Sequence, residues 1–365
     1  MKYILLFCLF LACLAAQAQD INKRLILIGD AGEINDKQQA LIPHAAKMVL
    51  PGKTLTYFLG DNIYPHGMEL VDSLKGATEA ILQSQFEPFS KQGVPVYFLA
   101  GNHDWDKSGP AGLAKIKAQA SYIESQPYTA LHFIPEAGTL GPFVQELSDS
   151  VVAISYDSEY WVFPHHADTA AVSEAKSKFT HALDSLAKVY HNKQLIVLSH
   201  HPMISYGEHS LYFSLSDHLF PLRIFWKKLY LPLPVVGSAY PLIRSTALRS
   251  AEDRKDPIYH SLIDSVTQAL GKHPRVLYIS GHDHGLQFIQ HQGLTQIVSG
   301  SGSKTSAIRK GPGIRYRYGQ QGFTVADFMR DGSLHIRFYK VEGGQVKQAF
   351  EQTLYTNKST NHYAN

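Results

Sequence analysis

Cysteine is nearly absent from this sequence: its 365 residues include two, Cys8 and Cys13. Both lie in an apolar stretch near the N-terminus, and none follows it. If that stretch is removed, the mature protein can form no disulfide, and its core has to be stabilised by packing alone. The lack of thiolate also disfavours iron–sulfur chemistry.

A strong charge of one sign is absent as well. The formal net charge is +3 over the whole chain, whereas a protein that mainly coats nucleic acid usually presents a strongly basic face. We therefore expect no nucleic-acid partner. The sequence shows no internal repeats, coiled-coil heptads or low-complexity linkers. Its length suits one large domain or two small ones.

A long apolar run extends from Tyr3 to Ala16, after the positive start Met1-Lys2. Small residues follow it where a signal peptidase reads them, with cleavage expected after Ala18. The run is short for a membrane span and lacks a stop-transfer flank. Residues 1–18 are thus predicted to be the signal peptide of an exported protein, periplasmic or secreted. Lipid anchoring at Cys13 is the alternative, and Phe10 in its lipobox-like stretch disfavours it.

Five short apolar segments, rich in β-branched residues, each end in a turn that carries glycine, histidine or aspartate. They are Leu25–Ile28, Leu55–Leu59, Val94–Ala100, Leu195–Leu198 and Val276–Ile279. Their length and composition are typical of buried strands. The sequence therefore predicts strands that deliver polar turns to one edge of a sheet.

Helical periodicity appears between these segments. The clearest stretches are Asp72–Phe89, Ala170–Tyr190 and Pro257–Leu270. Alternating strands and helices predict parallel β-α-β units. Two further segment pairs read as hairpins, which makes the sheets mixed. They are Phe143–Leu147 with Val151–Tyr156, and Phe323–Phe328 with Leu334–Tyr339. We expect one domain over residues 19–356, followed by a loose polar tail at 357–365.

Metal-competent side chains follow the five predicted strands. They are Asp30, Asp61, Tyr64, Asn102, His103, His200, His282 and His284. Ligands of open α/β sheets bind beyond the carboxyl ends of the strands, and this nitrogen and oxygen set suits Zn, Fe or Mn. Each motif alone is most often a plain turn. Five in order, each directly after a predicted strand, favour a metal site instead.

The motif order resembles the calcineurin-like metallophosphoesterases. The matching stretches are Asp30-x-Gly32, Gly60-Asp61-x-x-Tyr64, Gly101-Asn102-His103-Asp104, Val197-x-x-His200 and Gly281-His282-x-His284. Tyr64 narrows the resemblance to purple acid phosphatases, and the chain looks most like the small tartrate-resistant kind. The resemblance covers residues 24–340, apart from insertions. It implies an α/β fold, a four-layer α-β-β-α sandwich with two mixed β-sheets.

The resemblance also implies two metal sites. A ferric ion would be held by Asp30, Tyr64 and His284, a divalent Fe, Zn or Mn ion by Asn102, His200 and His282, with Asp61 bridging both. This division agrees with ligand chemistry. Phenolate and carboxylate are hard anionic donors that favour Fe(III), whereas an amide oxygen and two imidazoles suit a softer divalent ion.

The implied activity is hydrolysis of phosphate monoesters, small-molecule substrates, by a metal-bound hydroxide. His103 follows a ligand without being one, and His209 matches an active-site histidine of the tartrate-resistant enzymes. We expect both to act as acid or phosphate-binding groups on the substrate side. For His209 the alternative is a loop histidine exposed to water. His201 departs from the resemblance, because relatives often carry tyrosine there.

Other functions stay open on the same metal centre. A phosphodiesterase or nucleotide pyrophosphatase would share these motifs, because specificity lies in loops. A metal-holding binding protein without turnover is disfavoured by the complete ligand set together with His103 and His209. The sequence leaves the physiological substrate, the divalent metal, the pH optimum and the oligomeric state undecided.

The largest departure from the small relatives is an insertion at about 211–256. It is rich in apolar, aromatic and proline residues, with basic residues interspersed. Prolines and charges exclude a membrane span. An extra helical hairpin packed on the body, a peripheral membrane contact and a substrate-selecting lid are the alternatives. We favour the lid, because the insertion starts directly after His209.

Overall fold

Side chains of strand β1 (Ile21–Ile28) alternate between two buried faces. Leu25 and Leu27 pack into one apolar cluster, and Ile26 and Ile28 pack into another. Successive side chains of a strand point to opposite faces of its sheet. The sheet that contains β1 is therefore covered on both sides, which explains the continuous apolar run in the sequence.

In the computed structural model, the strands of the described residues, 20–210 and 252–355, form two sheets of seven strands each. The first sheet has the order β14-β13-β12-β1-β2-β3-β4. Strands β1 to β4 run parallel to one another. Beyond β1, the strands β12, β13 and β14 follow, and each pairs antiparallel with the strand before it. The bounds are β2 Thr54–Leu59, β3 Val96–Leu99, β4 Leu131–Phe133, β12 Gly322–Met329, β13 Leu334–Glu342 and β14 Gln345–Leu354.

The second sheet has the order β11-β9-β10-β8-β7-β6-β5. Its centre, β6, β7, β8 and β10, is parallel, and β5, β9 and β11 pair antiparallel at its two sides. The bounds are β5 Phe143–Ser148, β6 Val151–Ser155, β7 Gln194–Leu198, β8 Val276–Ser280, β9 Leu286–His291, β10 Leu294–Ser299 and β11 Ile314–Tyr318. Both sheets are mixed, as the predicted hairpins require.

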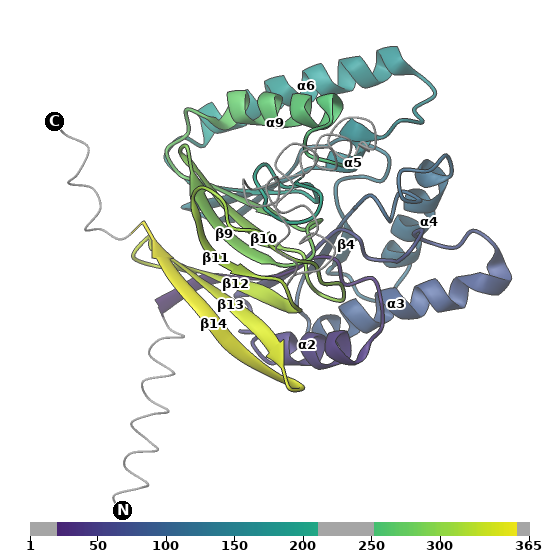
Figure 1. The fold of residues 1–365 in the computed structure, drawn as a ribbon, viewed down its shortest axis with the longest axis horizontal. Helices are drawn as coiled ribbons and strands as arrows, with labels where there is room; N and C mark the ends of the chain where they lie inside the picture. The colour runs from purple at the N-terminus through teal and green to yellow at the C-terminus, as the bar shows by residue number, and fades with distance from the viewer. Residues whose placement is uncertain (1–19, 211–251, 356–365) are drawn as a thin grey trace, which may run out of the picture.

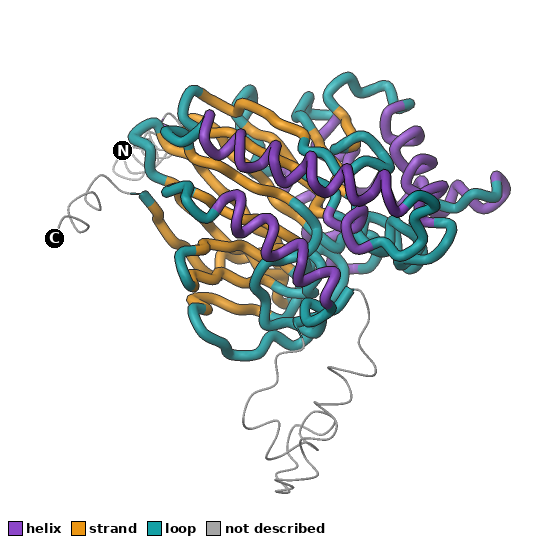
Figure 2. Tube along the Cα trace, turned by 90° about the horizontal axis from the view of Figure 1, so that it is seen from above, coloured by secondary structure: helices purple, strands orange, loops and turns teal. Residues whose placement is uncertain are grey.

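Helices cover the outer face of each sheet (Figure 1). The first sheet packs against α2 (Asp36–Ala46), α3 (Asp72–Ser90) and α4 (Gly112–Glu124). The second packs against α5 (Ser158–Val162), α6 (Thr169–Val189) and α9 (Pro257–Leu270). Figure 2, seen from the side of α6 and α9, shows two long helices lying side by side across the strands. The predicted four-layer α-β-β-α sandwich is confirmed.

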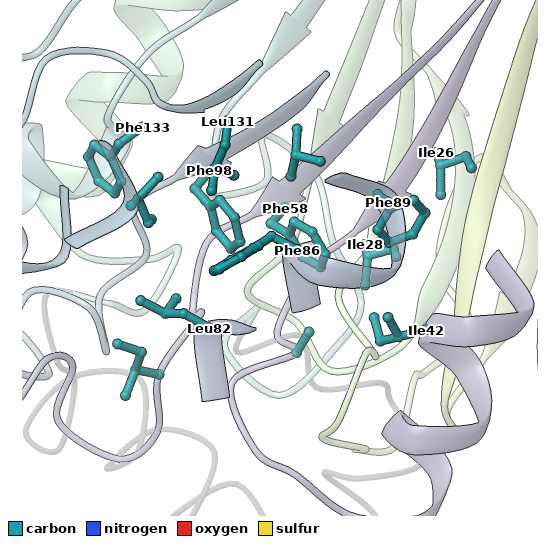
Figure 3. Close-up of a cluster of buried hydrophobic side chains, with 14 of the residues drawn as sticks. Ile26, Ile28, Ile42, Phe58, Leu82, Phe86, Phe89, Phe98, Leu131 and Phe133 are labelled. Atoms are coloured by element: carbon teal, nitrogen blue, oxygen red, sulfur yellow. The ribbon is translucent and has the colours of Figure 1, made fainter. Parts of the chain in front are cut away.

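Aromatic side chains fill the layer between the first sheet and its helices (Figure 3). Phe58 of β2 stacks on Phe98 of β3 with ring centroids 4.6 Å apart. Phe89 of α3 meets Phe58 edge-on, and Phe86 lies in the same cluster. Offset and edge-on pairs of this kind add to the free energy gained by burial. The strands that carry the candidate site thus rest on a well-packed core.

The five strands and three helices predicted from the sequence are all confirmed, as are both hairpins. Strand β1 begins earlier than predicted, at Ile21, and β3 begins later, at Val96. The predictions for residues 1–18, for 211–251 and for the tail at 357–365 lie outside the described residues. Among the helices of the described residues, none has both the length and the apolar character that a membrane crossing requires.

Some elements were missed from the sequence, chiefly α2, α4, the β9–β10 hairpin and β14. Strand β14 lies at the edge of its sheet and has no buried residue, so it lacks the apolar run that marks a buried strand. The β9–β10 hairpin turns at Gln292-Gly293, where both residues have positive φ. A glycine between two apolar segments is a recognisable signal of such a turn, so this hairpin could have been predicted from the sequence.

Asp157 should make stability depend on pH. Its carboxylate caps α5 and accepts a hydrogen bond from Trp105 Nε1 at 2.9 Å. Burial raises its pKa from 3.8 to about 7. The folded state therefore binds the carboxyl proton of Asp157 more tightly than the unfolded chain does. The protonated carboxyl contributes its full stabilisation below pH 3.8, and this stabilisation is lost as the pH rises through about 7.

Asp157→Asn keeps an oxygen acceptor and removes the ionisation. We expect the free energy of unfolding of the variant, relative to wild type, to rise between pH 4 and pH 7 by up to about 1.4 kcal/mol per pH unit. Urea unfolding at several pH values with matched metal content measures this difference. A difference that stays constant with pH would contradict the assignment.

Candidate metal centre

Five of the seven candidate ligands lie two or three residues beyond the carboxyl end of a strand. Asp30 follows β1, Asp61 follows β2, Asn102 follows β3, His200 follows β7 and His282 follows β8. The turns are bonded to one another: Asp30 N donates to Gly60 O at 3.0 Å, and Gly281 N donates to His200 O at 3.0 Å. Residues far apart in the sequence therefore meet where the edges of the two sheets adjoin.

Three of these residues have left-handed backbone conformations. The φ angles are 57° at Asp30, 55° at Asp61 and 69° at His282. Side chains seldom adopt this region, which costs about 1–3 kcal/mol per residue where the surrounding structure enforces it. Such strain is typical of residues whose side chains are aimed for function.

Two glycines leave room for the ligands. A Cβ atom at Gly60, whose φ is 91°, would lie 2.5 Å from His200 Nδ1. At Gly101 it would lie 2.3 Å from Asp61 Oδ1. Both separations are far below contact distance, so the motifs require glycine at these positions.

The first half of the site gathers around the Tyr64 hydroxyl. Tyr64 Oη lies 3.1 Å from Asp30 Oδ1, 3.0 Å from Asp61 Oδ2 and 3.2 Å from His284 Nε2. Ligand atoms of Asp30, Asp61 and His284 all lie within 4.8 Å of one another. The four side chains predicted for the ferric site are thus brought together.

The second half is a triangle of ligand atoms. Asn102 Oδ1 lies 3.1 Å from His200 Nε2 and 3.1 Å from His282 Nδ1. The two ring nitrogens are 3.2 Å apart. Separations near 3 Å suit ligands that each lie about 2 Å from a shared metal ion.

The protons of this triangle can be placed from its outer contacts. His200 Nδ1 faces Leu59 O at 2.9 Å, and His282 Nε2 faces Glu252 O at 3.0 Å. A carbonyl oxygen only accepts, so each of these nitrogens carries the proton. The nitrogens inside the triangle then present lone pairs, as does Asn102 Oδ1. Three acceptors converge without a donor between them, an arrangement that a cation stabilises.

Asp61 joins the two halves. Its Oδ2 contacts Tyr64 Oη, and its Oδ1 lies 3.4 Å from His200 Nε2. One carboxylate oxygen therefore faces each half, as a bridging ligand requires. Burial raises the pKa of Asp61, but the neighbouring histidines outweigh it and lower the pKa to about 2.

Burial sets the protonation of the remaining ligands. It lowers the pKa of His200, lowers that of His282 well below its usual value, and lowers that of His284 to about 3. These imidazoles are therefore neutral, which is the form that ligates metals. Burial, with Asp30 and Asp61, raises the pKa of Tyr64 well above 10. A bound cation reverses this effect and favours the phenolate.

His103 lies beside the bridging carboxylate. Its Nδ1 donates to Pro65 O at 2.6 Å, which leaves Nε2 directed at the site, 4.0 Å from Asp61 Oδ2. Its ring also meets the Tyr64 ring edge-on at 4.5 Å. The side chain is 17% exposed. His103 is thus within reach of a substrate, and its role stays a prediction.

His209 is also held at the site rather than on an open loop. Its ring lies 4.3 Å from the ring of His282, and its side chain is 24% exposed. The His209 amide donates to Asp283 Oδ1 at 3.0 Å, and Nδ1 lies 3.7 Å from Asp253 Oδ1. Burial lowers its pKa, but these two carboxylates and Glu252 outweigh burial and raise the pKa to about 9.

Asp104 links the two turns that follow β2 and β3. Its fully buried carboxylate accepts from Gly101 N at 2.8 Å, from Asn62 N at 2.9 Å and from Ile63 N at 3.1 Å. The turns that carry Asp61 and Asn102 are thereby held in register. The sequence motif contains Asp104, but its role could not be assigned without the structure.

Asp104→Ala would leave three buried backbone donors unpaired. At about 1–3 kcal/mol for each, we expect a loss of about 3–5 kcal/mol in the free energy of unfolding, after partial relaxation. Asp104→Asn keeps one acceptor and should lose about half as much. Urea unfolding of both variants measures the effect. A loss below about 1 kcal/mol for Asp104→Ala would contradict this role.

Glu252 was missed from the sequence because it lies at the end of the insertion and in no motif. Its Oε1 accepts from Asn102 Nδ2 at 3.0 Å, which turns Asn102 Oδ1 toward the triangle. Arg254 N donates to His209 O at 2.9 Å. The described end of the insertion, residues 252–256, thus reaches the candidate centre, whereas residues 211–251 lie outside the described part of the chain.

His201 is buried behind the divalent half. Its Nδ1 lies 2.9 Å from Ser158 Oγ, and its ring packs 4.4 Å from that of His282. Nε2 lies 3.7 Å from Glu159 Oε2, and neither of these two atoms has a hydrogen-bond partner among the described residues. His201 is therefore a buried neighbour of His282 and takes no place among the ligand atoms of the triangle.

A family model described as calcineurin-like phosphoesterase matches residues 23–286, which include all seven candidate ligands. The chain belongs to this family. It is 24% identical over 352 residues to purple acid phosphatase 7 of Arabidopsis thaliana, covering 90% of this chain and 86% of the relative. It is 23% identical over 315 residues to tartrate-resistant acid phosphatase type 5 of Oryctolagus cuniculus, covering 82% and 80%.

The calcineurin-like phosphoesterase fold is also seen in distant solved structures. One is GAP50, described as the anchor in the inner membrane complex of Plasmodium, with a TM-score of 0.60 and 16% identity over 92% of this chain and 89% of that one. Such a likeness shows the fold alone. The family and the acid phosphatase relatives together make this chain a metal-dependent phosphoesterase with a dinuclear metal centre, and confirm the predicted resemblance.

Proposed function

We propose that the protein hydrolyses phosphate monoesters, with Fe(III) in the Tyr64 half and a divalent Fe, Zn or Mn ion in the triangle. The observation that carries this is the three lone pairs of Asn102, His200 and His282, which converge without a donor and connect through Asp61 to a phenol. The donor types of each half fit the ion assigned to it.

The residues would divide the work as their positions suggest. Asp30, Tyr64 and His284 would hold the ferric ion, the triangle would hold the divalent ion, and Asp61 would bridge them. Two metal ions bound there lower the pKa of water and stabilise negative charge on phosphoryl oxygens. The neutral state of the three imidazoles leaves their lone pairs ready without a proton to expel.

Two further side chains would act on the substrate. His103 Nε2 points into the site beside Asp61, and the His209 ring lies against the ring of His282. Either histidine can donate a hydrogen bond to a phosphoryl oxygen or a proton to the leaving alkoxide. Together they would supply one group for the phosphoryl oxygens and one for the leaving oxygen.

Metal analysis with an absorption spectrum, followed by a panel of monoesters and diesters, tests the proposal. We expect two metals per chain, and higher kcat/KM on monoesters than on diesters. A preference for diesters or pyrophosphate bonds would favour the alternative phosphodiesterase or nucleotide pyrophosphatase. Two bound metals without turnover of any ester would favour a metal-holding binding protein.

We also propose that the chain is exported after loss of residues 1–18. The support is the charged start, the apolar run and the small residues before Gln19. Intact-mass measurement of protein recovered from the periplasm or medium tests this. A mature chain that begins elsewhere, or that carries lipid at Cys13, would contradict it.

A further inference from the structure

Lys304 places a positive charge beside the candidate ferric half. Its Nζ lies 4.8 Å from the centre of the Tyr64 ring, on the face of the ring. Its partner is Glu33, on the turn that follows β1. The lysine side chain is 35% exposed and that of Glu33 is 46% exposed. The ammonium group of Lys304 therefore lies against the ring of a candidate metal ligand and is partly exposed to solvent.

The backbone around Lys304 is fastened to two candidate ligands. On one side, Ser303 N donates to Asp30 O at 2.8 Å; on the other, Ser306 N donates to His284 O at 2.7 Å. Gln321 Nε2 also donates to Ser303 O at 2.6 Å. The position of Lys304 is thus set by the metal site itself, which distinguishes it from a lysine on an independent surface loop.

A polar hollow flanks this lysine, and both of its chain neighbours line it. The lining residues are Asn35, Asp36, Lys37, Ser303, Thr305 and Gln321. Its amide, hydroxyl and charged side chains suit a hydrophilic leaving group rather than an aromatic or acyl one. Space for the alcohol side of a substrate therefore lies next to the cation.

We propose that Lys304 binds a second anionic group of the substrate, a phosphate or carboxylate close to the phosphoryl group that is hydrolysed. This deepens the proposed function and rests on it, because it assigns a substrate class to the same site. Monoesters that carry a neighbouring anion are the favoured substrates. Glu33 occupies the lysine when such a group is absent and is displaced when it binds.

The energies favour this exchange. An exposed Lys–Glu pair contributes little to stability, so Glu33 gives way at little cost. A phosphate oxygen anchored nearby by metal ions offers Lys304 a charge-assisted hydrogen bond, which is stronger than a neutral one. An exposed ion pair is therefore replaced by a selective contact once the substrate is bound.

Binding to the metal-loaded protein tests the proposal without turnover. The probe is methylenediphosphonate, which carries two phosphonates and is not hydrolysed, with inorganic phosphate as its single-anion counterpart. We expect Lys304→Gln to weaken methylenediphosphonate binding about tenfold to a hundredfold in isothermal titration calorimetry, with little effect on phosphate. Lys304→Arg, which keeps the charge, should retain most of the affinity.

Two variants make the result decisive. Lys310→Gln removes the same charge from an exposed position of the same loop and should leave both affinities unchanged. Glu33→Gln frees the lysine and should strengthen methylenediphosphonate binding severalfold. Equal losses for both ligands in Lys304→Gln, a matching loss in Lys310→Gln, or no gain in Glu33→Gln would each overturn the subsite.

The subsite and the proposed function can fail separately. If wild type hydrolyses no ester but the binding difference persists, the proposed function fails and the anion subsite stands. If wild type hydrolyses simple monoesters and Lys304→Gln leaves methylenediphosphonate binding unchanged, the subsite fails and the proposed function stands.

Discussion

Alanine at His103 is expected to lower kcat about 10²–10⁴-fold while both metals stay bound. The imidazole Nε2 points into the site 4.0 Å from Asp61 Oδ2, whereas Nδ1 is fixed by Pro65 O. The ring is oriented, yet it takes no place among the ligand atoms of either half. Its loss should therefore remove a group that contacts the substrate and leave the metal set complete.

Steady-state kinetics together with metal analysis of the same preparation measures this. His66→Ala is the matched control, because His66 follows Pro65 in the same turn but is 56% exposed. It should keep both metals and near wild-type turnover. Parallel loss of metal and activity in His103→Ala would make His103 a ligand or a structural residue, and unchanged turnover would make it a bystander.

His209→Ala is expected to behave in the same way, with kcat reduced in the same range of about 10²–10⁴-fold. Because the His209 amide, not its side chain, holds Asp283, the loop should keep its position when the ring is removed. His260→Ala on α9, 59% exposed, is the control. Loss of metal from His209→Ala would show that the ring supports His282 rather than the substrate.

The sequence predicted the parts of this centre that lie directly after apolar strands. Alternating strand and turn signals placed Asp61 and His200 at one edge of a sheet. The structure places them on two adjoining sheets, with Asp61 Oδ1 and His200 Nε2 3.4 Å apart. Buried strands leave a strong local trace, because short continuous runs of β-branched residues between turn signals are typical of them.

Residues that act through contacts distant in sequence could not be predicted. Glu252 orients Asn102 across 150 positions, and Lys304 pairs with Glu33 across 271. Neither lies in a motif, and each alone reads as a charged surface residue. Pairing of this kind depends on how turns from different strands meet, so it becomes visible only when the sheets are assembled.

His201 illustrates the same limit in the core. In the sequence it was only a departure from the resemblance, with no role assigned to it. The structure buries it between Ser158 and the ring of His282, with Glu159 opposite. Helix α5, which supplies both Ser158 and Glu159, was not predicted, because its five residues are too few for helical periodicity to appear.

Tyr64→Phe is expected to abolish the visible colour of the iron-loaded protein. A phenolate bound to Fe(III) gives a charge-transfer band in the visible range, and Tyr64 Oη is the phenol oxygen placed between Asp30, Asp61 and His284. Burial and the two carboxylates oppose the phenolate, so it should form only when a metal cation compensates. Colour therefore reports directly on metal coordination by this residue.

Absorption spectra of iron-loaded wild type and variant, with iron measured in each, test this. Tyr57→Phe is a demanding control, because Tyr57 is fully buried on β2 just before the motif and donates its hydroxyl to Gln145 at 2.9 Å. That variant loses a buried hydrogen bond but should keep the band. A colourless iron-loaded wild type, or a Tyr64→Phe variant that keeps iron and colour, would show that Tyr64 does not bind the metal. The ferric assignment would then fail, while the triangle of Asn102, His200 and His282 would still provide a divalent site.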